Sequence, residues 1–287
     1  MKTPTFHRIK GLAFLLSATL LVSCGSYQIP QDPRVLEMAK AGKAYFEEKC
    51  RTVAGEKIYR TVPDVEGVLL MKVRPARSQT ELEDPMWPGA AFAIESYEDS
   101  YIKSFLGYEH AAGRPDGRAG VITKEHRGYI DSDKRPGGRP GYRFVDVMDA
   151  KDGQRVRVNG IWRVTGKKDT TAYNVKVELD KNPNYDLNVY SYILDKTPTT
   201  APAPRYGVTY EDHVIPSERA MGVASSTVKV IDLQTKEVLG EMIRYAYRPR
   251  GLRLTEWLTA DKCPAHAWGS DAATRKFVDQ VLIPKGE

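Results

Sequence analysis

The sequence lacks a hydrophobic run long enough to cross a membrane as a helix. Such a helix needs roughly 20 consecutive apolar residues, whereas the uncharged stretch from Gly11 to Val22 is much shorter. No later segment of the chain approaches the required length. The sequence therefore predicts no membrane-spanning helix, and any attachment to a membrane has to come from another feature.

Motifs of common enzymes are missing as well. The chain contains no G-x-S-x-G elbow and no G-x-x-x-x-G-K-[ST] phosphate loop. Ser100 to Lys103 and Ser226 to Lys229 both fit S-x-x-K, but no K-T-G or S-D-N completes a penicillin-binding or β-lactamase site. We therefore expect no catalytic residues and no cofactor. A divergent hydrolase is the enzymatic alternative, because a triad built from residues far apart in sequence is defined by its geometry.

Spacings that suit a metal are also absent. His110 and His126 belong to no paired motif such as H-E-x-x-H, and no cysteine cluster accompanies them. We expect both to be surface histidines. Asp131 and Asp133 start like a calcium-binding EF-hand loop, but Tyr142 stands where the bidentate acid is needed. The sequence predicts no metal site.

The chain has no large excess of basic or acidic residues beyond its first ten positions. The 43 Lys and Arg residues against 37 Asp and Glu residues give a formal net charge of +6. Lys2, Arg8 and Lys10 precede residue 11, and without these three the count is 40 against 37. A nucleic-acid-binding domain needs basic residues clustered on one face. We therefore expect no nucleic-acid partner.

What the chain does contain begins with a leader for export. The three basic residues precede the apolar segment, which ends at Leu21-Val22-Ser23-Cys24. Charge followed by a short apolar run is typical of a signal peptide. The last four residues resemble the lipobox of bacterial lipoprotein precursors. The resemblance covers the leader only, and its specificity comes from charge, apolar run and box occurring in this order.

The resemblance implies where the mature protein is held. Residues 1–23 would be removed as a signal peptide, Cys24 would be lipidated, and residues 24–32 would form a tether. Gly25 and Ser26 follow the cysteine, in place of the aspartate that commonly retains members of this family in the inner membrane. The resemblance therefore implies a lipid anchor in the outer membrane, facing the periplasm. An ordinary cleaved signal with an incidental cysteine is the alternative.

Two further cysteines, Cys50 and Cys263, lie near opposite ends of the remaining chain. An even pair in an oxidising compartment predicts a disulfide. Cys50 falls on an apolar stripe with helical spacing, in a helix that Asp32 can cap and Pro33 can start. The alternative is a buried free thiol on that helix face.

Short strands are predicted through the middle of the chain. Alternation of Tyr173, Val175, Val177 and Leu179 with polar residues predicts a half-buried strand. Residues 227–247 predict a hairpin, and Ser270 and Pro284 bound a predicted terminal helix. Other predicted strands cover 68–73, 142–148, 155–164, 187–194 and 206–210.

This order of elements predicts an α+β fold with a mainly antiparallel β-sheet flanked by N-terminal and C-terminal helices. Residues 33–287 are expected to form a single domain facing the periplasm. The Thr- and Pro-rich segment 197–204 is a candidate boundary for a subdivision, with a surface loop inside one domain as the equal alternative.

The segment from Gly107 to Gly141 is rich in glycine and in basic residues. It is either a surface loop that recognises a partner or an anionic group, or a solvated excursion without function. Its candidate binding residues are Arg114, Arg118, Arg127, Arg135 and Arg139.

Aromatic residues supply a weaker indication of an interface. Tyr185, Tyr190 and Tyr192 lie close together in the sequence, and Trp87 lies in a turn-rich segment. Such side chains suit interfaces because each joins apolar area to a polar tip. Packing within strands and the core is their commoner use.

Together these features favour a non-enzymatic, periplasm-facing lipoprotein that binds a protein partner or an envelope component. Its specific form would be an immunity-type inhibitor of a secreted toxin that acts on membrane lipid or cell wall. An assembly or scaffolding lipoprotein of the envelope fits the same observations, and the divergent hydrolase is the alternative from another class.

Overall fold

The structure is a computed structural model that describes residues 32–111, 120–123, 127–149, 152–249, 256–264 and 272–286. Cys24 and the rest of the leader lie outside these residues. The described part of the chain has an α+β fold with six α-helices and one large sheet. The helices are α1 (Pro33–Thr52), α2 (Gln79–Glu83), α3 (Glu98–Leu106), α4 (Tyr173–Lys181), α5 (Pro216–Ala220) and α6 (Ala273–Val281).

The large sheet has nine strands. Their spatial order is β1 (Gly55–Ile58), β11 (Val238–Tyr247), β10 (Val223–Asp232), β9 (Tyr206–His213), β3 (Gly67–Leu70), β6 (Phe144–Met148), β7 (Arg155–Lys167) and β8 (Asn188–Pro198), with β12 (Asp261–Cys263) also paired to β11. Two small sheets join β2 (Val62–Val65) to β13 (Leu282–Pro284), and β4 (Tyr108–His110) to β5 (Tyr129–Asp131). Two 3-10 helices, η1 (Pro88–Phe92) and η2 (Trp257–Thr259), complete the elements.

The sheet is mixed, which corrects the expectation of a mainly antiparallel one. Strand β3, in the middle of the sheet, pairs in parallel with both of its neighbours, β6 and β9. Parallel neighbours need a long crossover connection, and the chain passes through α2, η1 and α3 between β3 and β6. In the short apolar run of β3, Val68 and Leu70 are buried in the core and Leu69 between them is half-buried. Such a run fits a parallel or an antiparallel strand equally well.

The main core lies between this sheet and helices α3 and α6. It includes Phe105 from α3 and Phe277 from α6, which pack with apolar side chains of β3, β6, β7 and β10. Helix α6 contacts β1, β10 and β11, and α3 contacts β6 and β7. The core therefore fixes the inner half of β7, which is the base of the structure described next.

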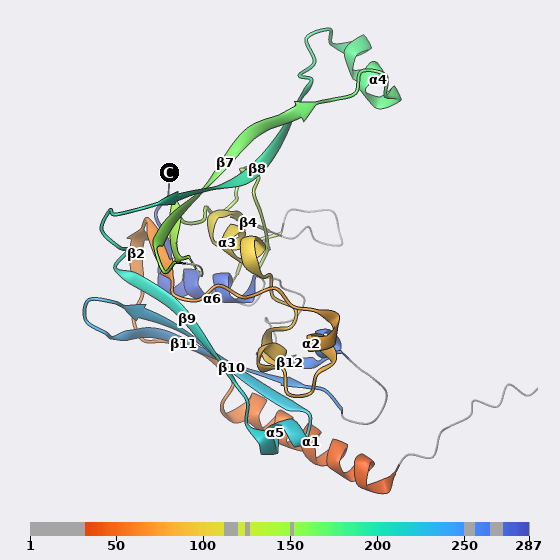
Figure 1. The fold of residues 1–287 in the computed structure, drawn as a ribbon, viewed down its shortest axis with the longest axis vertical. Coiled ribbons are helices and arrows are strands. Elements are labelled where there is room, and N and C mark those ends of the chain that lie inside the picture. Colours follow the sequence, from red (N-terminus) through yellow and green to blue (C-terminus); the bar gives the residue numbers. More distant parts are fainter. Residues whose placement is uncertain are drawn as a thin grey trace, which may run out of the picture.

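Strands β7 and β8 form an arm that leaves the body (Figure 1). Strand β7 pairs with β6 only from Arg155 to Val158, whereas its pairing with β8 continues to Lys167. The segment from Asn159 to Lys167 therefore belongs to a two-stranded ribbon. Helix α4 lies at the far end of this ribbon (Figure 1).

The helix at the end of the arm replaces a predicted strand. Residues 173–179 alternate like a strand, yet Tyr173–Lys181 is α-helical. Val175 is buried, Val177 and Leu179 are half-buried, and Tyr173 is exposed. Val175 and Leu179 are four residues apart and share a helix face. A short alternating pattern also places apolar residues at positions i and i+4, so it fits a helix as well as a strand.

The first helix is built as the sequence predicted. Asp32 accepts a hydrogen bond from the Arg34 N–H at 2.9 Å, and Pro33 occupies the first turn. Phe46 stacks on Tyr247 of β11 with ring centroids 5.8 Å apart, and the Tyr247 hydroxyl donates to the Ala39 carbonyl. These contacts hold α1 against β11.

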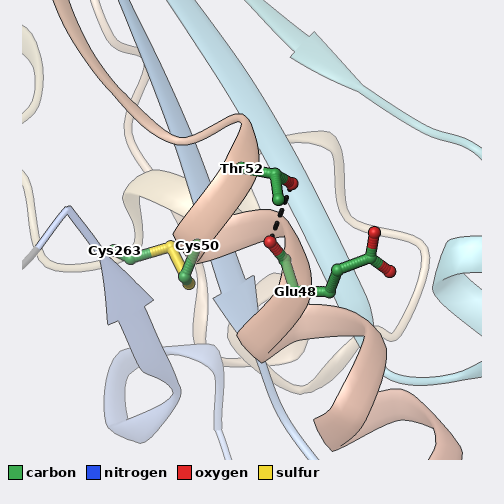
Figure 2. The surroundings of a disulfide bond; sticks show 4 residues. All are labelled: Glu48, Cys50, Thr52 and Cys263. Atoms are coloured by element: carbon green, nitrogen blue, oxygen red, sulfur yellow. Dashed lines mark hydrogen bonds between the residues drawn. A yellow bond between two sulfur atoms is a disulfide. The ribbon is translucent and has the colours of Figure 1, made fainter.

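A disulfide joins the end of α1 to β12 (Figure 2). The sulfur atoms of Cys50 and Cys263 are 2.01 Å apart and the Cα atoms 5.7 Å apart. The predicted pair is thus at bonding distance, well within the separation of about 7 Å that a disulfide can span. Thr52 closes the same helical turn by donating its hydroxyl hydrogen bond to the Glu48 carbonyl (Figure 2).

Within the described ranges, no helix combines the length and the apolar character needed to cross a bilayer.

Candidate functional site

The predicted basic loop is partly a structured hairpin. Strands β4 and β5 lie within residues 107–141, and Glu109 of β4 makes a backbone bridge with Arg139. Arg114 and Arg118 lie outside the described residues. Arg135 is exposed and pairs with Asp131 and Asp133, each at 2.9 Å. The described arginines of the loop are therefore not equivalent.

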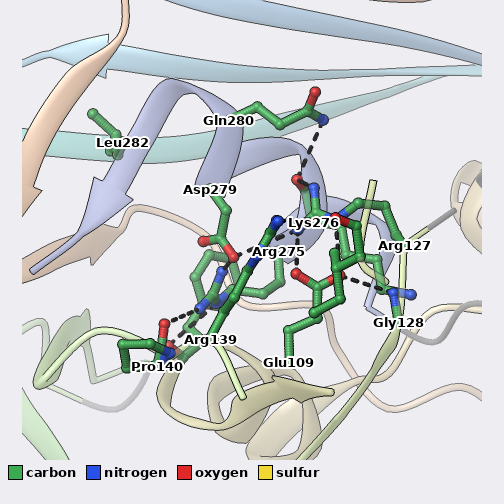
Figure 3. A network of polar contacts seen from close by, with 12 residues as sticks. Glu109, Arg127, Gly128, Arg139, Pro140, Arg275, Lys276, Asp279, Gln280 and Leu282 are labelled. Carbon is green, nitrogen blue, oxygen red and sulfur yellow. Dashed lines mark hydrogen bonds and ion pairs between the residues drawn. The ribbon is translucent and has the colours of Figure 1, made fainter. Parts of the chain in front are cut away.

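Arg127 belongs to a buried ion pair (Figure 3). Its guanidinium donates two hydrogen bonds to Glu109, at 2.8 and 2.7 Å, and one to the Lys276 carbonyl of α6 at 2.5 Å. Burial alone would raise the pKa of Glu109, but Arg127 and the Gly128 N–H hold it below its ordinary value. Arg127 therefore fastens the hairpin to α6 and does not reach a partner at the surface.

The same network fixes the segment that follows the hairpin. Arg139 donates to the Ile122 carbonyl at 3.0 Å, so this predicted binding residue also has a structural contact. Arg275 of α6 pairs with Asp279 and donates to the Pro140 carbonyl (Figure 3). The Tyr142 hydroxyl donates to the Leu282 carbonyl at 2.7 Å. Residues 140–142 are thereby held in place between α3 and β13.

These fixed residues form the floor of a groove between the base of the arm and the hairpin. The groove has a volume of about 310 Å³ and is lined by Tyr108, Lys134, Arg143, Trp162, Tyr192 and Lys285, together with small residues of the floor. A second hollow of about 580 Å³ shares Tyr108, Lys134 and Pro140 with it and extends along Arg135. We call the two together the basic–aromatic groove.

The arm supplies the aromatic wall of the groove. Trp162 of β7 lies opposite Tyr192 of β8 in the strand register, and their rings meet edge to face at 5.5 Å. A Cβ atom at Gly160 would lie only 1.6 Å from the Tyr192 hydroxyl. Glycine at this position therefore leaves room for the Tyr192 ring, whose burial raises the pKa of its hydroxyl.

Two cations that line the 310 Å³ hollow share one carboxylate. Arg143 pairs with Glu66 at 3.2 Å, and Lys285 pairs with the same carboxyl at 2.7 Å. The hydrogen bond from Lys285 lowers the pKa of Glu66. No carboxylate belongs to the described residues that line the 310 Å³ hollow. This hollow is consequently positive.

Beyond the groove, the arm carries exposed apolar side chains. Val164 lies opposite Tyr190 in the register, and the two are 52% and 50% exposed. Directly opposite residues point to the same face of a ribbon, so this pair continues the face of Trp162 and Tyr192. Val189 and Tyr173 are 38% and 84% exposed. Val189 adjoins Tyr190 in β8 and so points to the other face of the ribbon. We call Val164, Tyr173, Val189 and Tyr190 together the arm patch.

The histidine of the hairpin has no surface role. His110 is 5% exposed, and its ring lies beside those of Tyr108 and Tyr129. Its Nε2 lies 2.8 Å from the Asp133 carbonyl and 3.1 Å from the Asp131 carboxylate. The expectation of a surface histidine is therefore wrong for His110, because Tyr129 of β5 and Gly138 pack against its ring. His126 lies outside the described residues, among which no group of His, Cys, Asp and Glu is arranged to hold a metal.

A second charged cluster is enclosed in the core. Glu95 pairs with Arg244 at 3.0 Å and with Arg74 at 3.5 Å, and all three side chains are buried. The Arg74 guanidinium lies between the rings of Phe92 and Tyr210, at 3.6 and 3.4 Å from their centroids. Burial would raise the pKa of Glu95, but Arg244 and Arg74 lower it below its usual range. The carboxylate stays ionised and ties β11 to the segments that follow β3 and η1.

Sequence reasoning found part of the groove and missed the rest. It selected Arg135, and it noted Tyr190 and Tyr192 as residues for an interface or for packing. It assigned no role to Trp162, Arg143 or Lys285, which come from separate parts of the chain. The alternation of Trp162 and Val164 with polar residues indicates that the strand continues beyond Val158, where its pairing with β6 ends. This pattern was the signal that could have found the aromatic wall.

Comparison of the chain with protein-family models, with curated proteins and with solved structures gave no match. The role of the site therefore has to follow from its own geometry.

Proposed function

We propose that this protein is a non-enzymatic, lipid-anchored envelope protein that binds a partner protein through the arm patch. The observation that carries the proposal is the exposure of four large apolar side chains on the arm, three of them on the β7–β8 ribbon and Tyr173 on α4 at its end. Scattered exposed apolar residues are common on proteins. Here they gather on one projecting element and include two tyrosines, a residue type enriched at binding hot spots.

The construction of the arm supports this role. A two-stranded ribbon is only marginally stable in water when no further strand or helix packs against it. Among the described residues, no third strand pairs with β7 from Asn159 outward, and β8 is the last strand of the sheet. Apolar contact with a partner would stabilise the ribbon and remove the arm patch from water.

The leader supports the location. A cysteine at position 24 in a lipobox would place lipid at the mature N-terminus, ahead of α1, which begins at Pro33. With Gly25 and Ser26 after it, the proposed location is the outer membrane, facing the periplasm. The partner would then be an envelope protein or a secreted toxin, as an immunity-type inhibitor requires. A toxin gene beside this one would favour inhibition, and an envelope-assembly operon would favour scaffolding.

Site-specific photo-crosslinking in intact cells tests the proposal. A photoreactive phenylalanine analogue replaces Tyr173 in the arm patch, and in a matched strain it replaces Met38, an equally apolar exposed residue on α1. We expect a discrete protein adduct from position 173, none of that mass from position 38, and loss of the adduct when Val164→Lys is added. Adducts that form equally at both positions, or that persist with Val164→Lys, would contradict the proposal.

The oligomeric state of the purified protein shows whether the arm patch binds a second copy of the chain. If the adduct has twice the mass of the chain and the protein is a dimer that Val164→Lys converts to a monomer, the arm patch binds a second copy and the proposed partner is wrong.

A further inference from the structure

The basic–aromatic groove has the features of a ligand site that is separate from the arm patch. Its 310 Å³ hollow lies at the base of the arm, against residues of the folded body. Small-molecule sites typically measure about 300 to 1,000 Å³ and combine apolar walls with a few placed polar groups. The hollow meets both conditions, since aromatic side chains and cations both line it.

We propose that this groove binds a saccharide that carries an anionic group. The aromatic wall offers the ring faces of Trp162 and Tyr192, and ring faces attract the slightly positive C–H groups of a sugar through their quadrupole. Pro140 and Gly141 of the floor line the same hollow, together with Leu106 and Tyr142 of the core. The flat, narrow shape of a pyranose ring suits a hollow between such a wall and such a floor.

The cations that line the hollow select for negative charge. Arg143 and Lys285 approach one carboxylate, Glu66, so the three groups carry a net positive charge. Guanidinium and ammonium groups bind phosphate or carboxylate through charge-assisted hydrogen bonds. Both cations are also exposed, with 51% and 43% of their side chains accessible. A phosphate or a carboxylate on the sugar is therefore the expected anion.

The groove is also prepared before a ligand arrives. Its floor is fixed by the bond from the Tyr142 hydroxyl to Leu282 and by the bond from Arg275 to Pro140. Gly160 allows Tyr192 to lie against β7 and keeps its ring at the wall. A site that is formed in advance loses less conformational entropy on binding.

Nuclear magnetic resonance of the purified mature chain, from which only the leader is absent, tests this proposal. The Trp162 indole N–H signal is assigned by its loss in Trp162→Phe, and the protein is titrated with glucose 6-phosphate, glucuronic acid, glucose and inorganic phosphate. We expect saturable shifts with at least one of the two anionic sugars, with affinity at least tenfold, or about 1.4 kcal/mol, above that of glucose and of phosphate. The phosphate-bearing and carboxylate-bearing probes distinguish the two possible anions.

Matched variants locate the interaction. Arg143→Met and Lys285→Met should each weaken binding of the preferred sugar at least tenfold. Arg163→Met removes another exposed arginine, paired with Asp195 at 3.4 Å, next to Trp162 in β7. Neighbouring residues of a strand point to opposite faces, so this control should bind within twofold of the wild type.

Four results would overturn the proposal. These are no saturable shift with either anionic sugar, equal affinity for glucose, equal affinity for phosphate alone, and equal weakening by Arg163→Met. Unfolding curves of each variant show whether the body is intact, and a folded Arg143→Met protein with unchanged affinity counts against the site. The arm-patch variant Val164→Lys should keep sugar binding, so failure of the proposed partner function and failure of this site give different results.

Discussion

Removal of the Cys50–Cys263 disulfide should cause a large loss of stability. The cysteines are 213 residues apart in the sequence, so the bond closes most of the folded chain into one loop. In the chain-entropy model such a cross-link restricts the unfolded ensemble by about 5 kcal/mol at 25 °C. For a chain of this size, each kcal/mol corresponds to roughly 2 to 4 °C. We therefore expect the Cys50→Ala/Cys263→Ala variant to melt roughly 10 to 20 °C below the oxidised wild type.

Part of the loss will come from packing and not from the cross-link. Cys263 is buried beside Phe46 and Tyr245, and replacement of a sulfur atom by hydrogen leaves a small void there. Deletion of a buried group of that size costs about 1 kcal/mol. The single variant Cys50→Ala should therefore lose nearly as much stability as the double variant, because either change removes the whole cross-link.

Denaturant unfolding, followed by circular dichroism with and without a phosphine reductant, measures these effects. The reductant should destabilise the wild type and leave the double variant unchanged. A double variant within about 1 kcal/mol of the oxidised wild type would refute the reasoning, because the model predicts several times that loss. Free thiols at both positions in protein purified from the periplasm would also refute it.

Three other changes have defined outcomes. Glu109→Gln should lower the free energy of unfolding by about 3 kcal/mol, because it removes the nearer of the two carboxylates that face the buried Arg127 and leaves only Asp279, at 3.7 Å. Glu37→Gln, at an exposed pair on α1, should change it by less than about 0.5 kcal/mol in the same denaturant titration. Hydrogen bonds from Arg205 and from the turn after β10 lower the pKa of Asp232 to about 2, below its ordinary 3.8. The stability that this carboxylate contributes should be present above about pH 4 and be lost as the pH falls toward 2, so unfolding curves of the wild type and Asp232→Asn should differ at pH 6 and converge near pH 2; a constant difference would contradict the assignment. Cys24→Ser should abolish labelling by a fatty-acid analogue and release the protein from membranes, and labelling that persists would exclude Cys24 as the lipidated residue.

Local patterns predicted the ends of the chain well. Asp32 and Pro33 start α1, and α6 (Ala273–Val281) lies within the predicted terminal helix. The prediction was wrong for Leu282–Pro284, which form strand β13, and the predicted cap Ser270 lies outside the described residues. Capping and helical spacing depend on residues within a few positions of one another. The cysteine pairing was predictable for a different reason, since only two candidates remained once Cys24 was assigned to lipid.

The mixed sheet and the arm depend on contacts that such patterns do not contain. The neighbours of β3 are β6 and β9, which lie far along the chain. Residues 173–179 fit a strand by alternation, and their position at the end of a ribbon, away from any sheet, decides for a helix. The segment predicted as a basic loop contains β4 and β5, and the spacing of its arginines could not show that Glu109 and α6 enclose Arg127.

The affinity of the partner for arm-patch variants tests the central claim most directly. Once the protein adduct from position 173 is identified, the partner is purified and its Kd is measured for the wild type, Val164→Lys, Tyr173→Ser and the α1 control Met38→Ser. Binding through the arm patch predicts that each arm variant raises the Kd at least tenfold, which is a loss of about 1.4 kcal/mol of binding free energy. The Kd of Met38→Ser should stay within twofold of the wild-type value. Equal affinity for the wild type and both arm variants, with all proteins folded, would contradict it.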